Sequence, residues 1–318
     1  MKRQSLKIVF AAGVAISLVA TSVFLSCRSG NKQGYDETPT RGDIKICVDE
    51  SYQPIIDSQI YAFTSVYGYA KITPSYKPEY DVINDFMNDS VKLIVTNKQL
   101  TEDQIKTLRD TLIIARTTAF AFDALALIIN KENKDTLFNY NTVKNIFLGN
   151  IKTWKDINPN SGSDKISVVF DNTKSGNIRY FKEKFEINSK LPENFYAVNN
   201  NEEVINFISN NKNALGIISV NWISDKDDPQ TKKFKNNIKV AAVSPSFDNS
   251  SYYYPEQGAI YNKSYPFTRE VYLISRETFA GLGSGFVQWV THDKGQLIVL
   301  KSGLVPSVMP VRLVQVKH

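Results

Sequence analysis

The chain has 318 residues, 42% of them apolar, and a formal net charge of +6. This length and composition can bury a large core, which excludes general disorder and favours two lobes or domains over one. Three of the basic residues (Lys2, Arg3 and Lys7) lie at the very start, and the remaining charge calls for no nucleic-acid partner.

The N-terminal segment is typical of a secretory signal. A basic start precedes an apolar run from Ile8 to Leu25, and the run ends in the lipobox-like sequence F-L-S-C at Cys27. We expect a signal peptide over residues 1–26, lipid attachment at Cys27 and a flexible tether over 27–42. The alternative is a transmembrane anchor, since the run is nearly long enough to span a bilayer.

The next part of the chain alternates predicted strands and helices. Strands are expected over 43–48, 70–74 and 92–96, and helices follow them over 55–66, 82–87 and 101–108, the last opened by a capping box at Thr101. The Ser51-Tyr52 corner therefore lies at a helix N-terminus, where backbone N–H groups are free to bind an anion. Capping alone would explain Ser51 about as well.

A second strand-rich region follows. We expect a short strand over 112–115, a hinge over 116–120 and a buried strand over 122–129, because the last is a compact apolar run. A helix over 141–147 should end at Gly149 in a left-handed conformation. The strand over 166–170 leads through Asp171 to Ser175-Gly176-Asn177 at the start of another helix.

The C-terminal part contains a helix near 203–209, a strand over 213–220 and a strand over 265–274. Two helical segments then follow, closed by Gly303 with Pro306 just beyond. The basic run 232–235 fits a solvated helix face better than a ligand patch.

The sequence gives little support for a metal site or for a catalytic nucleophile. The two histidines, His292 and His318, and the two cysteines, Cys27 and Cys47, offer no credible zinc cluster. A Ser-His-Asp arrangement would need His292, which fits a turn on a helix surface better. We therefore expect no metal, no cofactor and no enzymatic activity.

Several of these segments resemble one family. The sequences DALALIIN and IFLGNIKTWKDIN, the Tyr265–Arg269 pattern Y-P-x-x-R and the run from Gly285 to Pro306 resemble, in consistent order, the phosphate-binding proteins that serve ABC importers. The resemblance implies an α/β type II periplasmic binding fold with two lobes, each a mixed sheet flanked by helices, and two hinge crossovers. The lobes would comprise 43–119 with 265–318, and 120–264.

The resemblance also implies a ligand site between the lobes. The ligand-binding residues carried over from it are Ser51, Tyr52, Thr96, Asn97, Lys98, Ser175, Gly176 and Asn177, with Asp49, Glu79 and Asp171 as ligand-side carboxylates. This chain departs from the family where Asn177 replaces the Thr of S-G-T and where Asp171 stands near an Arg of some members. Lys77 and Glu79 also stand where small residues are usual.

The implied function is capture of phosphate, or a similar oxyanion, by a monomeric, periplasm-facing lipoprotein that works with an ABC permease. Its membrane contact would be the lipid anchor. One alternative is a sensing or adhesion lipoprotein that keeps the fold without transport. The other is a phosphate-ester hydrolase, which would need a metal cluster or an activated nucleophile.

Overall fold

The computed structural model describes residues 37–245 and 251–309. The predicted signal peptide, Cys27 and most of the predicted tether lie outside the described residues. Within the described part of the chain, no helix has both the length and the apolar character needed to cross a membrane.

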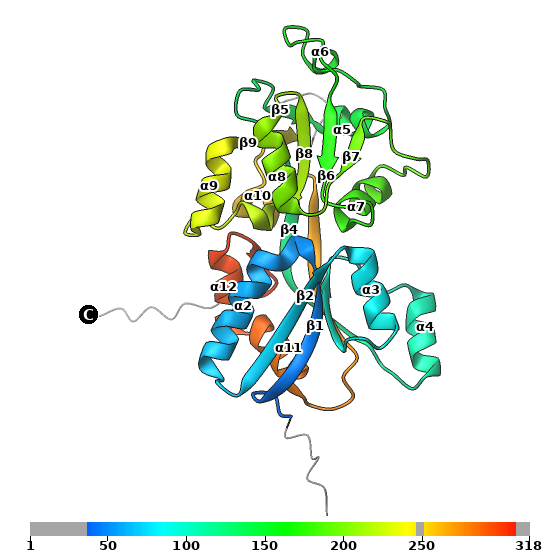
Figure 1. The fold of residues 1–318 in the computed structure, drawn as a ribbon, viewed down its shortest axis with the longest axis vertical. Helices are drawn as coiled ribbons and strands as arrows, with labels where there is room; N and C mark the ends of the chain where they lie inside the picture. The colour runs from blue at the N-terminus through cyan, green and yellow to red at the C-terminus, as the bar shows by residue number, and fades with distance from the viewer. Residues whose placement is uncertain (1–36, 246–250, 310–318) are drawn as a thin grey trace, which may run out of the picture. The chain divides into compact units, whose positions relative to one another are not determined.

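The strands of the described residues form one ten-stranded sheet and one two-stranded sheet (Figure 1). They are β1 (Gly42–Asp49), β2 (Ala70–Lys77), β3 (Leu93–Thr96), β4 (Arg116–Asn130), β5 (Leu137–Asn139), β6 (Ser167–Phe170), β7 (Phe195–Ala197), β8 (Ala214–Ser219), β9 (Ile238–Val240), β10 (Ala242–Ser244), β11 (Thr268–Ser275) and β12 (Val305–Pro306).

Helices connect most of these strands. They are η1 (Glu50–Tyr52), α2 (Gln53–Val66), α3 (Glu79–Met87), α4 (Glu102–Asp110), α5 (Tyr140–Phe147), α6 (Trp154–Ile157), α7 (Gly176–Lys184), α8 (Asn201–Asn210), η2 (Val220–Trp222), α9 (Pro229–Asn237), α10 (Gln257–Tyr261), α11 (Leu282–Thr291) and α12 (Asp293–Lys301), where η marks 3-10 helices.

The long strand β4 belongs to both halves of the large sheet. The strand order is β2-β1-β3-β11-β4-β8-β6-β7, with β9 and β12 also paired to β4. The first part of β4, up to Ala124, pairs with β11, and the part from Leu125 pairs with β8. We call the strands on the β11 side of this change the first lobe and those on the β8 side the second lobe.

Both lobes contain parallel and antiparallel pairs. In the first lobe β1 pairs in parallel with β2 and β3, whereas β11 is antiparallel to β3 and β4. In the second lobe β6 is parallel to β7 and β8, and β4 is antiparallel to β8. The predicted α/β fold with two mixed sheets and flanking helices is confirmed.

Local signals in the sequence account for most of the elements. Thr101 forms the predicted capping box, with its hydroxyl accepting from the Gln104 N–H and the Gln104 side chain accepting from the Thr101 N–H. Gly149 and Gly303 have φ of 76° and 86°, as expected for residues that end helices.

One predicted strand is wrong. Residues 112–115 form a turn and irregular chain, with Leu112 at a φ of 61°, and Leu112 and Ile114 are exposed. The strand begins instead at Arg116 and includes the whole predicted hinge at 116–120. The apolar Leu-Ile-Ile run resembled a strand, but only Ile113 of the three packs against the core, and the run forms no strand. The predicted lobe boundaries stay a prediction.

Candidate functional site

The corner after β1 is buried and is held by its own carboxylate. Asp49 Oδ1 accepts from the Ser51 N–H at 3.0 Å and so caps the short helix η1. The Ser51 hydroxyl lies 3.3 Å from Asn177 Oδ1 in the other lobe. Asn221 Nδ2, also from the second lobe, donates to the Ser51 carbonyl oxygen at 3.1 Å. This corner therefore contacts the second lobe at two points.

The corner after β6 has the arrangement expected of a helix N-terminus. Ser175 is the N-cap of α7, and its hydroxyl oxygen accepts from the Asn177 N–H at 3.0 Å. The same hydroxyl donates to Asp171 Oδ1 at 2.5 Å, and Asn177 Nδ2 donates to that oxygen at 3.0 Å. Asp171 is thus held beside the start of α7.

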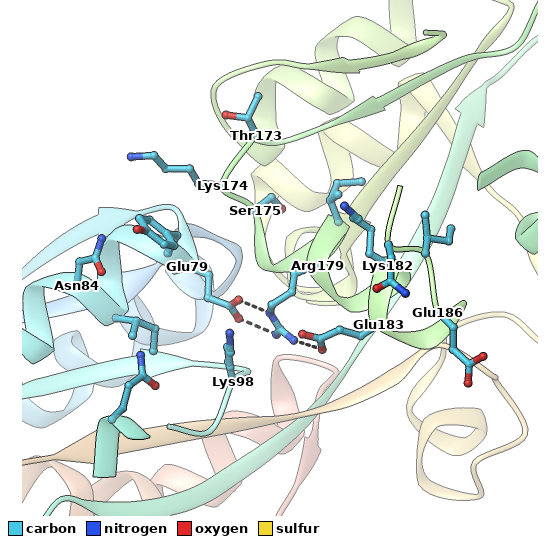
Figure 2. Close-up of a pocket in the computed structure, with 16 residues that line it drawn as sticks. Glu79, Asn84, Lys98, Thr173, Lys174, Ser175, Arg179, Lys182, Glu183 and Glu186 are labelled. Atoms are coloured by element: carbon cyan, nitrogen blue, oxygen red, sulfur yellow. Dashed lines mark hydrogen bonds and ion pairs between the residues drawn. The ribbon is translucent and has the colours of Figure 1, made fainter. Parts of the chain in front are cut away.

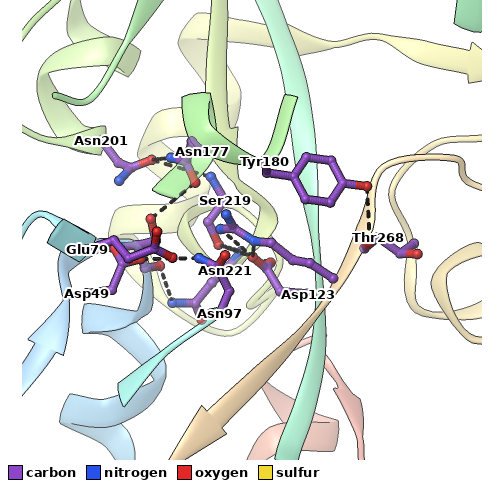
Figure 3. Close-up of polar contacts among 12 residues, drawn as sticks. Asp49, Glu79, Asn97, Asp123, Asn177, Tyr180, Asn201, Ser219, Asn221 and Thr268 are labelled. Atoms are coloured by element: carbon purple, nitrogen blue, oxygen red, sulfur yellow. Dashed lines mark hydrogen bonds and ion pairs between the residues drawn. The ribbon is translucent and has the colours of Figure 1, made fainter. Parts of the chain in front are cut away.

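The corner after β3 meets the other two. Asn97 Nδ2 donates to Asp49 Oδ2 at 3.3 Å, and the Thr96 hydroxyl donates to Glu79 Oε2 at 3.4 Å. The Lys98 N–H donates to Thr96 Oγ1 at 3.1 Å. The three predicted corners therefore meet in one polar cluster (Figure 3).

Arg179 joins the lobes at the edge of this cluster. Its Nε and Nη2 donate to the two carboxylate oxygens of Glu79 at 2.5 and 2.9 Å, and Nη2 also donates to Asn97 Oδ1 at 2.5 Å. Nη1 donates to Glu183 one turn further along α7 at 2.5 Å (Figure 2). A bidentate guanidinium–carboxylate pair of this kind is both directional and strong.

A second arginine is buried beneath the cluster. Arg269 on β11 donates through Nε to Asp123 Oδ2 on β4 at 2.9 Å, and its Nη2 lies 2.8 Å from the same oxygen. The Ser219 hydroxyl lies 3.0 and 2.9 Å from the two Asp123 oxygens. The Arg269 guanidinium also lies over the Tyr52 ring, 5.3 Å from its centroid.

Some buried polar atoms of the cluster lack a partner. Among the described residues, Arg269 Nη1, the Tyr52 hydroxyl and Asn221 Oδ1 find no hydrogen-bond partner. Leaving such groups unpaired in a protein interior costs on the order of 1–3 kcal/mol each. Two donors that share one buried region indicate a place where an acceptor group would be stabilised.

The cluster is rich in carboxylates, and burial is the main cause that raises their pKa values. Burial, with repulsion by Glu79, raises the pKa of Asp49 to about 7. Burial, with repulsion by Asp171, raises the pKa of Glu50 to about 8. Burial likewise raises the pKa of Asp171 to about 6 and raises that of Asp123. Near neutral pH the cluster therefore holds protonated and ionised carboxyl groups together.

Two clefts open onto the cluster. One, of about 1130 Å³, is lined by Glu79, Lys98, Ser175 and Arg179 (Figure 2). The other, of about 270 Å³, is lined by Glu50 and Asp171. A small solute would have polar access to the region between the lobes through either cleft.

The structure brings most of the predicted site residues together. Contacts link Asp49, Ser51, Thr96, Asn97, Ser175, Asn177, Glu79 and Asp171, and Gly176 lies against Glu79. Tyr52 joins through its ring contact with Arg269, and Lys98 lines the larger cleft. Their role in ligand binding stays a prediction.

The sequence reasoning missed Arg179, Arg269, Asp123 and Glu50. A signal for one residue of a pair existed, because Asp123 puts a charge inside the apolar part of β4, and such a charge is usually paired when buried. Among the described residues, no group of three or more His, Cys, Asp or Glu could hold a metal ion.

Comparison with known proteins gives relatives of low identity and high coverage. The phosphate-binding protein PstS of Borreliella burgdorferi is 22% identical over 301 residues, which cover 92% of this chain and 97% of that protein. PstS of Staphylococcus aureus is 23% identical over 288 residues, covering 88% and 83%.

Solved structures show the same fold. A proposed phosphate ABC transporter substrate-binding protein with bound phosphate, from Clostridium perfringens, matches with a TM-score of 0.71 and 20% identity, covering 84% of this chain and all of that one. An ABC-type phosphate transport receptor from Vibrio cholerae matches with a TM-score of 0.61 and 18% identity, covering 83% and 99%. The family model of the PBP superfamily domain matches residues 33–294, and the chain belongs to this family.

Proposed function

We propose that this protein binds phosphate, or an oxyanion of similar shape, outside the cytoplasm and delivers it to an ABC importer. The relatives named above are phosphate-binding proteins or phosphate transport receptors, and one was solved with phosphate bound. The protein would act as a monomeric receptor and not as an enzyme.

The observation that carries the proposal is the buried Arg269 guanidinium with its unpartnered Nη1, next to the unpartnered Tyr52 hydroxyl. Around them the corners at Ser51, Thr96 and Ser175 meet, and helices start at the Ser51 and Ser175 corners. Each helix N-terminus carries roughly half a positive charge. Guanidinium, hydroxyls and helix N-termini are the groups that suit a phosphate.

The buried carboxyl groups of the proposed site would affect its selectivity between phosphate and sulfate. Asp49 and Asp171 are both buried, one from each lobe. An ionised carboxylate accepts a hydrogen bond from the proton of monohydrogen phosphate, whereas sulfate has no such proton to donate. We therefore propose that Asp171, which is mostly ionised at neutral pH with its pKa of about 6, favours phosphate over sulfate, and that Asp49 does the same above its pKa of about 7.

Calorimetric titration tests this function. Phosphate should bind, and sulfate should bind on the order of a hundredfold more weakly, because a site that hydrogen-bonds a proton rejects an analogue without one. Ser51→Ala should weaken phosphate binding roughly tenfold through loss of one hydrogen bond. Ser58→Ala, on the exposed side of α2, is the matched control and should leave it unchanged. If neither anion binds at millimolar concentration, the phosphate assignment is wrong.

Two alternative functions make predictions that differ from those of a transport receptor. A sensing or adhesion lipoprotein could bind phosphate equally well, so dependence of phosphate uptake on a cognate permease separates it from a transport receptor. A hydrolase acting on phosphate esters would release phosphate from a chromogenic ester.

We also propose a lipid anchor at Cys27 as the membrane contact. Cys27→Ala should move the protein from the membrane fraction to the soluble fraction, because the rest of the chain would have no acyl group to insert. Mass analysis of the membrane-extracted protein checks this. A chain that still carries Lys2 and Arg3, without an added diacylglyceryl group, would contradict it.

A further inference from the structure

The carboxylate of Glu79 lies directly against the start of α7. A Cβ atom placed on Gly176 would be 2.8 Å from Glu79 Oε2 and 3.0 Å from Glu79 Cδ, so the carboxylate packs on the glycine where a side chain would otherwise stand. Gly176 is the first residue of α7, and the end of a helix at this position attracts negative charge.

The same carboxylate is surrounded by anion-binding groups. The Arg179 guanidinium holds both of its oxygens, and the Thr96 hydroxyl donates to Oε2. The Glu79 side chain is only 4% exposed. A guanidinium fork, a hydroxyl and a helix start are the groups that would bind a free oxyanion, and here they bind a carboxylate supplied by the first lobe (Figure 2).

We propose that Glu79 is a tethered anion that competes with the solute for Arg179 and the start of α7, and so determines the affinity of the site. This inference rests on the proposed oxyanion-binding function. Since Glu79 is joined to the same chain, its effective concentration at Arg179 is high, and a soluble oxyanion must displace it or accept its repulsion. Removing the charge should therefore strengthen phosphate binding.

A purely structural role for Glu79 predicts the opposite result. The Glu79–Arg179 pair also joins the two lobes, so if it only favoured closure around the ligand, its loss would weaken binding. The sign of the change in affinity thus separates competition from closure. Glu183 provides a matched control, because it binds the same arginine at 2.5 Å but is 59% exposed and lies about two turns of α7 away from Gly176.

The test is calorimetric titration of phosphate into wild type, Glu79→Gln and Glu183→Gln. We expect the dissociation constant to fall at least tenfold in Glu79→Gln and to change by less than about threefold in Glu183→Gln. In Glu79→Ala, added acetate should compete with phosphate, whereas in the wild type it should not. Circular dichroism melting of each variant checks that the fold is kept, and Glu79→Ser serves as a second variant.

The outcomes are distinguishable. Suppose that wild type binds phosphate measurably and that both Glu79→Gln and Glu79→Ser bind it with unchanged or weaker affinity. That result overturns the competition and leaves the proposed function intact. Phosphate binding to wild type that becomes at least tenfold tighter when Glu79 is replaced supports the competition. Absence of phosphate binding in wild type and in every variant overturns both the proposed function and this inference.

Discussion

Replacing Arg269 by alanine should destabilise the protein by about 3–5 kcal/mol, the usual cost of leaving one member of a buried ion pair without its partner. The Arg269 and Asp123 side chains are 3% and 0% exposed, so water cannot take the place of the lost guanidinium. Asp123 would keep only its hydrogen bonds with neutral groups such as Ser219.

The position of the pair enlarges this effect. Arg269 on β11 is directly opposite Asp123 on β4, and Ser219 on β8 is opposite Leu125, just past the point where β4 changes lobes. The three side chains therefore join the central strands of both lobes. The Arg269→Ala variant also loses the contact of the guanidinium with the Tyr52 ring.

Urea unfolding of Arg269→Ala, followed by circular dichroism, measures the loss. The double variant Arg269→Met with Asp123→Asn should recover at least about half of it, since it removes both charges and keeps a hydrogen-bonding group for Ser219. Arg109→Ala, at an exposed position of α4, is the control and should cost less than about 0.5 kcal/mol. A loss below about 1 kcal/mol in Arg269→Ala would contradict the buried-pair argument.

The double variant also separates structure from ligand binding. Because it should fold while lacking a guanidinium beside Tyr52, phosphate binding should be lost if Arg269 holds the anion. Phosphate binding that survives in the folded double variant would remove Arg269 from the proposed site and leave its structural role.

The elements that could be predicted from the sequence are those with local causes. The run from Ala124 to Ile129 is a strand because it is apolar on both faces, and β4 is indeed buried on both sides along this part. The helix after Thr101 begins where its capping box requires. The corners at Ser51 and Ser175 were identified because helix starts have recognisable capping residues.

The pairing of charges across the site could not be predicted in this way. Arg179 and Glu79 are 100 residues apart in the chain, and Arg269 and Asp123 are 146 apart. Nothing in the local sequence around Arg179 distinguishes it from an ordinary basic residue on a helix surface. The Arg179–Glu79 pair depends on how the two lobes meet, and the Arg269–Asp123 pair depends on the register of β11 against β4, so both are made by the tertiary fold.

Raising the pH from 5 to 8.5 should destabilise the unliganded protein by about 3–6 kcal/mol, because buried carboxyl groups of the site must lose their protons. Burial raises the pKa of Asp49 to about 7, of Glu50 to about 8 and of Asp171 to about 6. The same groups in the unfolded chain have pKa values of about 4.

The sign of this pH dependence follows from the number of protons bound by the folded and the unfolded states. Between about pH 4 and its own raised pKa, each of these groups has lost its proton in the unfolded chain and keeps it in the folded protein, so over this range the folded state binds more protons than the unfolded state. The free energy of unfolding then falls as the pH rises through this window, by up to about 1.4 kcal/mol per pH unit for each proton retained. The three carboxyl groups repel one another and lose their protons stepwise, which keeps the total below the sum of independent groups.

Urea unfolding at pH 5, 6, 7 and 8.5 measures how the free energy of unfolding depends on pH. The Asp49→Asn variant should show a weaker dependence. The asparagine keeps an oxygen for the Ser51 N–H but carries no proton to lose, so the variant should be less affected than wild type by the rise in pH. Asp43→Asn is the matched control, because Asp43 is exposed and pairs with Lys71 at the surface, and it should reproduce the wild-type slope. A stability that is constant or that increases from pH 5 to 8.5 would mean that the buried carboxyl groups of Asp49, Glu50 and Asp171 are already ionised in the folded protein.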